Sequence, residues 1–333
     1  MRFPISLTWQ LSKYLIKKKL AREKHFPLVL MLEPLHACNL SCVGCGRIRE
    51  YKSTISSKLS LEECIQAVDE CEAPVVSLCG GEPLMYPQID ALVQEIINRK
   101  RHIYLCSNGV LIPKLIQRFQ PNPYLMFNIH LDGTQEYHDK IVNQEGVFEK
   151  AIHSIKMLKK AGFQVCTNTT VYRDTNTDDV IRLFSLLTGL NIDGILISPA
   201  YGFEECDPSI FLDQNEIKEK FKRIDESSRK FPWYSTPIYR DFLKGDKDLE
   251  CSFWANVTRN LLGWKAPCYL ITDGYFSSYN DFKEEVQWEN YGPGKDKRCT
   301  NCMSHVGFEA TVALGPQNTL LDTIKLISWN LFS

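Results

Sequence analysis

Short apolar runs alternate with amphipathic stretches between residue 28 and about residue 201. The apolar runs lie at 28–34, 75–83, 102–109, 124–133, 164–172 and 194–201. Runs of this length that end in turn residues are typical of buried strands. Apolar residues recur at helical spacing over 60–72, 89–100, 147–161 and 178–188. Strands that alternate with helices in this order indicate parallel βα units.

The helical stretches also carry signals at their ends. Ser60 and Glu63 have the spacing of a capping box, and Gly162 suits the C-terminal cap of the helix before it. Six βα units are fewer than the eight that close a full barrel. We therefore predict an α/β fold with an open, partial (β/α)6 barrel over residues 28–205. Periodicity alone is also compatible with a doubly wound sheet.

The remaining segments have a different character. Residues 1–27 form a basic, amphipathic segment, in which Leu7, Leu11 and Tyr14 recur at helical spacing among lysines. Such a helix either lies on an anionic membrane surface or packs on the domain. Residues 206–312 predict a charged helix (213–231) and then a loop-rich, cysteine-containing extension. Residues 313–333 predict an apolar helical tail that docks on the domain or on lipid.

Composition and charge narrow the class of protein. The 333 residues are 44% hydrophobic and 24% charged, and the net charge is −1, so we expect no nucleic-acid partner. There is no apolar run of about 18 residues and no signal-peptide layout. We therefore expect a cytoplasmic protein, with peripheral contact at the inner membrane face as one role of the N-terminal helix. In a reducing compartment, 13 cysteines favour metal binding or catalysis over disulfides.

Three cysteines share one short loop directly after the first predicted strand. Cys38, Cys42 and Cys45 form a C-x3-C-x2-C pattern. Three thiolates can hold three irons of a [4Fe–4S] cluster and leave the fourth iron open to a ligand, which suits catalysis. Structural zinc prefers four closed ligands, usually as two separated pairs, and would need His36 here. The pattern therefore favours an iron–sulfur cluster.

A second motif follows the next predicted strand. Together, the cysteine loop and Gly80-Gly81-Glu82-Pro83 resemble the radical S-adenosylmethionine (SAM) superfamily. The resemblance implies that the open iron binds SAM and that the GGEP segment meets its methionine amino group. Glycines permit a close approach of backbone to ligand, in agreement with this role. One departure is Gly44, where the superfamily usually carries an aromatic residue, and this departure affects the expected packing against adenine.

Polar residues stand at the ends of four other predicted strands. They are Asn108, Asp132, Asn168 and Ser198. Active-site residues of such barrels lie where strands run into the following loops. We expect these side chains to meet the ribose hydroxyls or the methionine carboxylate of SAM. Turn capping is the alternative role for each of them.

A closer resemblance covers residues 10 to 312. Its motifs are PLVLMLEPLHACNLSCVGCG, GGEPL, YLCSNG, HLDG, TNTT, ISPAY, RNLLGWKAPCYL and the CxxC stretch at Cys299. They are similar to those of the adenosyl-hopene transferase (adenosylhopane synthase) family. The resemblance implies addition of the 5′-deoxyadenosyl group of SAM to the alkene of diploptene, a polycyclic triterpene lipid. It also implies a flavodoxin- or ferredoxin-type electron donor.

The resemblance implies roles for further cysteines. Cys106, in the YLC segment, corresponds to the family's hydrogen donor, although a small buried side chain is the alternative. Cys251, Cys268, Cys299 and Cys302 are compatible with an auxiliary cluster, with zinc or with plain burial, so a second metal site near Cys299 and Cys302 stays open. Two other functions also stay open. One is a peptide-modifying radical SAM enzyme that abstracts hydrogen, and the other is a non-catalytic iron–sulfur protein.

Overall fold

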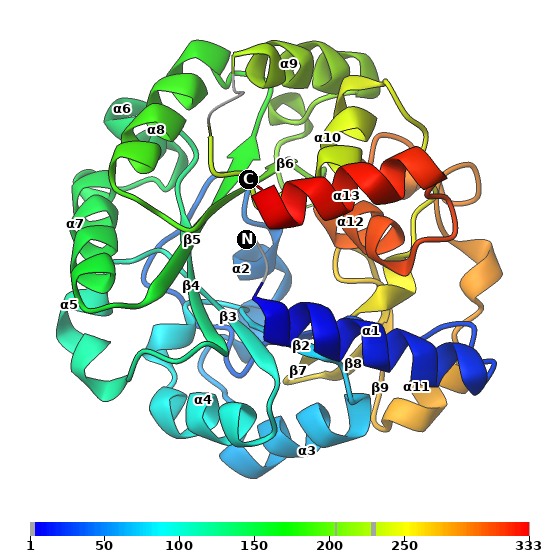
Figure 1. Ribbon diagram of the computed structural model, residues 1–333. Coiled ribbons are helices and arrows are strands. Elements are labelled where there is room, and N and C mark those ends of the chain that lie inside the picture. The colour runs from blue at the N-terminus through cyan, green and yellow to red at the C-terminus, as the bar shows by residue number, and fades with distance from the viewer. Residues whose placement is uncertain (1–3, 204, 228–230, 333) are drawn as a thin grey trace.

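Six parallel strands form the centre of the computed structural model, which describes residues 4–203, 205–227 and 231–332. They are β1 (Val29–Leu32), β2 (Val75–Leu78), β3 (His102–Ser107), β4 (Leu125–His130), β5 (Gln164–Val171) and β6 (Gly194–Pro199). Each strand pairs with the next along the chain, and the long helices between these strands lie outside the curved sheet (Figure 1). This arrangement confirms the predicted partial barrel.

The helices on the outer face lie where the apolar spacing predicts them. They are α3 (Leu61–Cys71), α4 (Ile89–Asn98), α7 (Val147–Lys160) and α8 (Thr177–Gly189). Three short helices, α2 (Gly46–Glu50), α5 (Ile112–Leu115) and α6 (Gln135–Ile141), were not predicted from the spacing. The capping box of α3 has both of its hydrogen bonds. Glu63 N donates to Ser60 Oγ at 3.1 Å, and Ser60 N donates to Glu63 Oε2 at 2.7 Å.

The C-terminal part continues the same sheet. The strand β7 (Asn256–Asn260) pairs in parallel with β1, and the antiparallel strands β8 (Gly263–Pro267) and β9 (Thr272–Phe276) follow it. Four helices accompany them, α9 (Gln214–Glu226), α10 (Pro237–Lys244), α11 (Tyr279–Glu285) and α12 (His305–Leu314). The loop-rich prediction was wrong for these strands. The predicted charged helix ends at Glu226, and residues 228–230 lie outside the described part. The division of the chain at residues 27, 205 and 312 stays a prediction.

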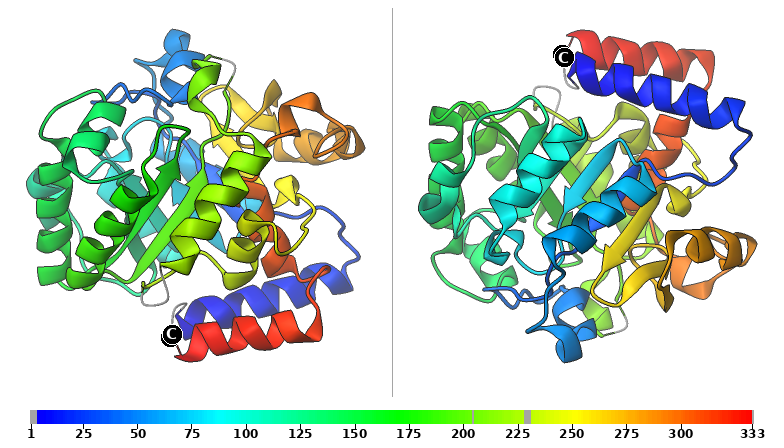
Figure 2. Two further views of the ribbon diagram at one scale, coloured as in Figure 1. Left: turned by 90° about the horizontal axis from the view of Figure 1, so that it is seen from above. Right: turned by 90° about the horizontal axis from the view of Figure 1, so that it is seen from below.

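The two terminal helices lie side by side across one end of the barrel. They are α1 (Ile5–Leu20) and α13 (Leu320–Phe332), shown in blue and red in Figure 2. Gln10 Nε2 donates to the carbonyl of Lys100, just before β3, so this is the end at which the parallel strands begin. The loop that follows β1 lies at the opposite end (Figure 2). Among the described helices, none is long and apolar enough to cross a membrane.

A buried ion pair joins the C-terminal part to the barrel. Arg47 Nε on α2 lies 3.6 Å from Glu33 Oε1, and both side chains are buried. Asn260 Nδ2, at the end of β7, donates to Glu33 Oε2 at 3.3 Å. Burial is the largest single influence and raises the pKa of Glu33, but Arg47, His36 and Lys265 together outweigh it, and the pKa falls to about 2. The carboxylate is therefore charged and depends on these partners.

A second contact reinforces this junction. Lys265 Nζ on β8, fully buried, lies 3.2 Å from Glu50 Oε1 at the end of α2. Arg47 Nη2 also donates to the carbonyl oxygen of Tyr269. The guanidinium carbon lies 3.9 Å from the centre of the Tyr269 ring. The short helix α2 therefore forms ion pairs with a residue of the barrel, Glu33, and with a residue of the C-terminal part, Lys265.

We predict that Arg47→Leu lowers the free energy of unfolding by about 3–5 kcal/mol, because it leaves Glu33 as an uncompensated buried charge. Urea denaturation at pH 7, followed by circular dichroism, measures the change. Arg223→Leu is the matched control, because Arg223 pairs with Asp178 on the exposed surface, where such a pair contributes about 0–1 kcal/mol. Equal, small losses in both variants would contradict the role of Arg47.

Candidate active site

The three cysteines of the first motif lie together between β1 and α2. Cys38, Cys42 and Cys45 are each partly exposed. Burial raises the pKa of Cys38 to about 11, and the nearby Cys45 thiol adds to this increase. Burial also raises the pKa of Cys42, with further contributions from Cys45 and Cys38. Because the three thiols act on one another, they are close neighbours, and their donor set fits three irons of one cluster. Metal binding would then have to displace their protons.

The GGEP segment packs backbone to backbone against the cysteine loop. Gly80 has a φ of +104°. A Cβ on Gly81 would lie 1.9 Å from the carbonyl oxygen of Ala37, so no larger residue fits there. Gly81 N donates to Leu35 O at 3.1 Å, and the next backbone N–H, that of Glu82, donates to Ala37 O at 2.8 Å. The two glycines therefore set the position of the cysteine loop.

The carboxylate of Glu82 has partners within the protein. It is buried and accepts hydrogen bonds from Asn108 N at 2.9 Å and from Leu84 N at 3.1 Å. Burial raises its pKa to about 7. Pro83, also buried, begins the short turn that follows. These contacts give Glu82 a structural role, and its contact with the methionine amino group stays a prediction.

Three of the predicted SAM residues lie at the same end of the sheet. Asn108 Nδ2 donates to Asn39 Oδ1 at 2.8 Å and so reaches the cysteine loop. Asp132 is fully buried, with its carboxylate 2.8 Å from His130 Nε2. Asn168 Oδ1 is buried and has no hydrogen-bond partner among the described residues. A buried amide oxygen without a partner is costly, so this atom fits a ligand hydroxyl or amine.

The fourth residue is engaged elsewhere. Ser198 Oγ lies 3.4 Å from Tyr239 Oη and accepts from His305 N at 3.3 Å. Ser198 therefore links β6 to the C-terminal helices, which is a long-range contact and not the local turn capping of the alternative. Its contact with SAM stays a prediction.

Aromatic rings from the loops that follow two other strands flank the cysteine loop. A Cβ on Gly44 would lie 2.4 Å from the ring of Tyr172, which follows β5. A Cβ on Gly46 would lie 2.3 Å from the ring of Phe203. The space of the aromatic residue expected at position 44 is thus partly filled by Tyr172. Sequence analysis missed this residue, although its place directly after a strand end was a signal.

Cys106 lies on the inner wall of the barrel. Its Sγ lies 3.4 Å from Ser77 Oγ on β2 and accepts from Asn128 Nδ2 on β4 at 3.6 Å. Burial raises the pKa of the Cys106 thiol, so it keeps its proton at neutral pH. Sequence analysis did not single out Ser77 or Asn128, although strand alternation places both on the face of Cys106.

Below Cys106 the inner wall becomes apolar. Tyr104 precedes Cys106 by two residues on β3 and therefore shares its face. It packs in one cluster with Met126, Cys166, Leu196 and Tyr234. The barrel is therefore polar at the end with the cysteine loop and apolar at the end near α1.

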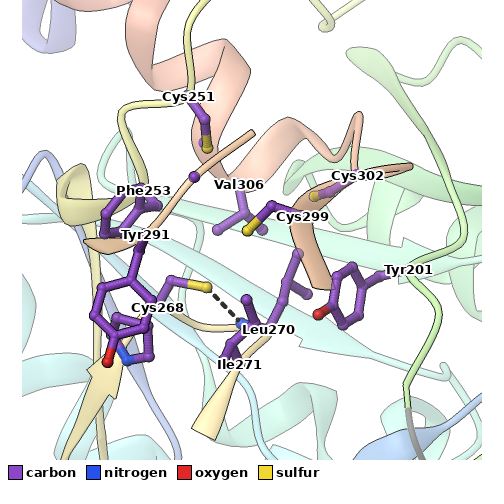
Figure 3. Close-up of a pocket in the computed structure, with 13 residues that line it drawn as sticks. Tyr201, Cys251, Phe253, Cys268, Leu270, Ile271, Tyr291, Cys299, Cys302 and Val306 are labelled. Carbon is purple, nitrogen blue, oxygen red and sulfur yellow. Dashed lines mark hydrogen bonds between the residues drawn. The ribbon is translucent and has the colours of Figure 1, made fainter. Parts of the chain in front are cut away.

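The four cysteines of the C-terminal part line one pocket. Cys251, Cys268, Cys299 and Cys302 surround it (Figure 3). All 13 cysteines are free thiols. In the described chain, no three Cys, His, Asp or Glu side chains converge on a point suited to a single metal ion, and this applies to both cysteine sets.

Two sequence profiles match successive parts of the chain. Residues 32–187 match the Radical SAM superfamily, and residues 195–326 match a domain of unknown function, DUF3463. Curated relatives include an AdoMet-dependent heme synthase of Methanosarcina barkeri, 28% identical over 61% of this chain and 60% of its own. Another is the mycofactocin maturase MftC of Mycolicibacterium smegmatis, 28% identical over 48% of this chain and 41% of its own.

The fold is similar to that of solved structures. Streptococcus suis SuiB bound to S-adenosylmethionine superimposes with a TM-score of 0.63 at 14% identity, covering 88% of this chain and 72% of SuiB. The chain spans about 60% of the length of the heme synthase that it matches. The matched profile, the cysteine loop and the strand order agree, so residues 32–187 are similar to the Radical SAM superfamily in both sequence and fold.

Proposed function

We propose that the protein adds the 5′-deoxyadenosyl group of SAM to the alkene of diploptene or a related polycyclic triterpene, giving adenosylhopane. The observation that carries this proposal is the position of Cys106. It is a protonated thiol on the inner wall, between the polar end of the barrel and the apolar cluster below. A thiol S–H is a good hydrogen-atom donor, and apolar side chains below it suit contact with a hydrocarbon substrate.

The polar end of the barrel supplies the sites for the cluster and SAM. Cys38, Cys42 and Cys45 would hold three irons, as in the radical SAM superfamily. Asn168 Oδ1 offers a buried acceptor, and Asn108 and Asp132 lie at the same edge. When bound and reduced, the cluster and SAM supply an adenosyl radical together with methionine. The protein positions these groups and excludes water.

Cys106 completes the reaction. Addition to the terminal alkene carbon leaves a tertiary carbon radical on the lipid. The S–H bond of Cys106 then breaks and a C–H bond forms, which leaves a thiyl radical. One electron from the flavodoxin- or ferredoxin-type donor and one proton restore the thiol. Because Ser77 and Asn128 hold Sγ, hydrogen reaches one face of the radical.

The helix pair α1 and α13 suits a lipid substrate. On α13, Leu320, Ile324, Ile327 and Leu331 fall on one exposed face of the helix, and Leu320 is 77% exposed. Trp9 on α1 is 72% exposed. This apolar face lies at the end where the apolar part of the barrel interior begins.

Charge also favours a membrane surface. Lys13 and Lys19 are exposed on α1, the helix that carries Trp9, and basic residues attract anionic lipid headgroups. Leu7 of α1 lines a pocket together with Tyr104 and Tyr234 of the inner wall. We propose that the helix pair rests on the bilayer and that the lipid enters the barrel beside it.

Hydrogen abstraction from a peptide is the second candidate. The relatives favour it, because they include a mycofactocin maturase, and SuiB has been solved with the precursor peptide SuiA. In that reaction the adenosyl group leaves as 5′-deoxyadenosine and does not enter the product. The two candidates therefore differ in the fate of the adenosyl group.

We predict that Cys42→Ala abolishes SAM cleavage, because two thiolates do not hold the cluster at this site. Anaerobic assays with dithionite measure methionine release, and electron paramagnetic resonance (EPR) measures the cluster signal that changes when SAM is added. Cys64→Ala is the control, because Cys64 is a buried cysteine on α3 whose side chain packs in the main core. Full SAM cleavage by Cys42→Ala would overturn the assignment of the cysteine loop.

For Cys106→Ala we predict continued carbon–carbon bond formation but loss of the single product epimer, because hydrogen comes from another source. Chromatography resolves the adenosylhopane epimers formed from diploptene. In D2O, the wild type should place one deuterium on the new C–H carbon, since the thiol proton exchanges with solvent. Cys71→Ala is the control, because Cys71 is a buried cysteine on α3 in the main core, and this variant should keep the single epimer. A single unchanged epimer from Cys106→Ala would exclude the donor role.

We predict that the Lys13→Glu/Lys19→Glu variant loses binding to vesicles that contain phosphatidylglycerol. Each basic residue near such a surface contributes about 1 kcal/mol, so binding should weaken at least roughly thirtyfold and wild-type binding should fall with salt. Sedimentation with vesicles measures this. The variant Leu320→Gln/Ile324→Gln should weaken binding too, whereas Leu186→Gln, on exposed α8, should not. Equal binding by all four proteins would exclude the docking role.

A further inference from the structure

The four-cysteine pocket draws its thiols from three separate segments. Cys251 precedes β7, Cys268 follows β8, and Cys299 and Cys302 precede α12. They surround about 390 Å³ of space, part of it open to solvent, and the remaining walls are mostly apolar (Figure 3). Thiols brought together from distant segments are not explained by local packing within one helix or strand.

The thiols are neighbours of one another. The charges of Cys302, Cys268 and Cys299 all act to raise the pKa of Cys251, after burial. Cys64 and Cys71 serve as a comparison, because they are buried cysteines without a neighbouring thiol among the groups that shift their pKa. Burial is the largest influence on their pKa as well.

Backbone N–H groups point at all four sulfurs. Leu270 N donates to Cys268 Sγ at 3.4 Å. Burial raises the pKa of Cys299 to about 11 and that of Cys302 to about 12, and hydrogen bonds from backbone groups partly offset this increase. A backbone hydrogen bond has the same effect on Cys251. Hydrogen bonds of this kind stabilise thiolates that bind metal and tune iron–sulfur clusters.

The spacing of the four thiols differs between a site for a single metal ion and a site for an iron–sulfur cluster. A tetrahedral zinc ion with Zn–S bonds of about 2.3 Å needs its thiolates about 3.8 Å apart. In an iron–sulfur cluster each thiolate binds a different iron, so the thiolates stand around a larger body. The four thiols of this pocket surround a space, as Figure 3 shows. We propose that Cys251, Cys268, Cys299 and Cys302 bind a second iron–sulfur cluster.

Such a cluster would have four protein ligands and no open iron, so it would not bind SAM. Its position still connects it to the radical SAM site. Tyr269 directly follows Cys268, and its ring and carbonyl contact Arg47, which lies two residues after Cys45. Contacting residues thus join the two cysteine sets. This path suits one-electron transfer from the reductant to the first site.

The test uses the variant Cys38→Ala/Cys42→Ala/Cys45→Ala, which keeps only the C-terminal cysteine set. Purified without oxygen, it should hold about four iron and four sulfide ions per chain, against about eight of each in the wild type. Its reduced EPR signal should not respond to SAM. Adding Cys299→Ala/Cys302→Ala should remove the remaining iron, whereas adding Cys64→Ala/Cys71→Ala should not.

The first variant gives a result even if the variant without Cys299 and Cys302 fails to fold. Absence of iron from the first variant, or zinc in its place, would overturn the proposal. The inference does not depend on the proposed transfer reaction. The first variant lacks the cysteines of the first site, and measuring its iron content needs no substrate. A failure of one proposal therefore does not affect the other.

Discussion

The buried pair of Arg47 and Glu33 is the interaction on which the rest of the structure depends. Removing two charges from water is costly, so the pair persists only where further partners complete it. Here those partners come from both matched regions of the chain, because Asn260 and the Tyr269 carbonyl belong to the C-terminal part. Arg47 lies only two residues after Cys45, so the ion pair is next to the cysteine loop in the sequence. The six barrel strands and the three added strands form one sheet, and this pair holds the cysteine loop and α2 against it.

From this junction, the barrel interior changes character along its axis. The end with the cysteine loop carries carboxylate, amide and thiol groups, and the end near α1 carries aromatic and aliphatic side chains. Cys106 stands where these two environments meet. In the proposed reaction, a radical formed at the polar end would meet an apolar acceptor that enters from the other end, and Cys106 would donate hydrogen beside the point of contact. The helix pair α1 and α13 extends the apolar character to the outer surface.

Much of this architecture could be predicted from local patterns. The strands of the barrel, the capping box at Ser60 and the cysteine loop depend on neighbours in sequence, and all appear as predicted. The missed features depend on distant contacts. Strands β7 to β9 are five residues each, and β7 and β8 are buried on both faces, so they show no alternation. Tyr172 fills space beside Gly44 from another strand, and no spacing rule links these two positions. Ser77 and Asn128 contact Cys106 because β3 lies between β2 and β4, and this strand order is not visible in the sequence.

The fate of the adenosyl group tests the central claim most directly. The wild-type protein, reduced without oxygen, is supplied with SAM and diploptene, and methionine, 5′-deoxyadenosine and lipid products are quantified by mass spectrometry. The account predicts one adenosylhopane for each methionine, with little free 5′-deoxyadenosine. Methionine and 5′-deoxyadenosine in equal amounts, with no adenosylated lipid, would contradict it.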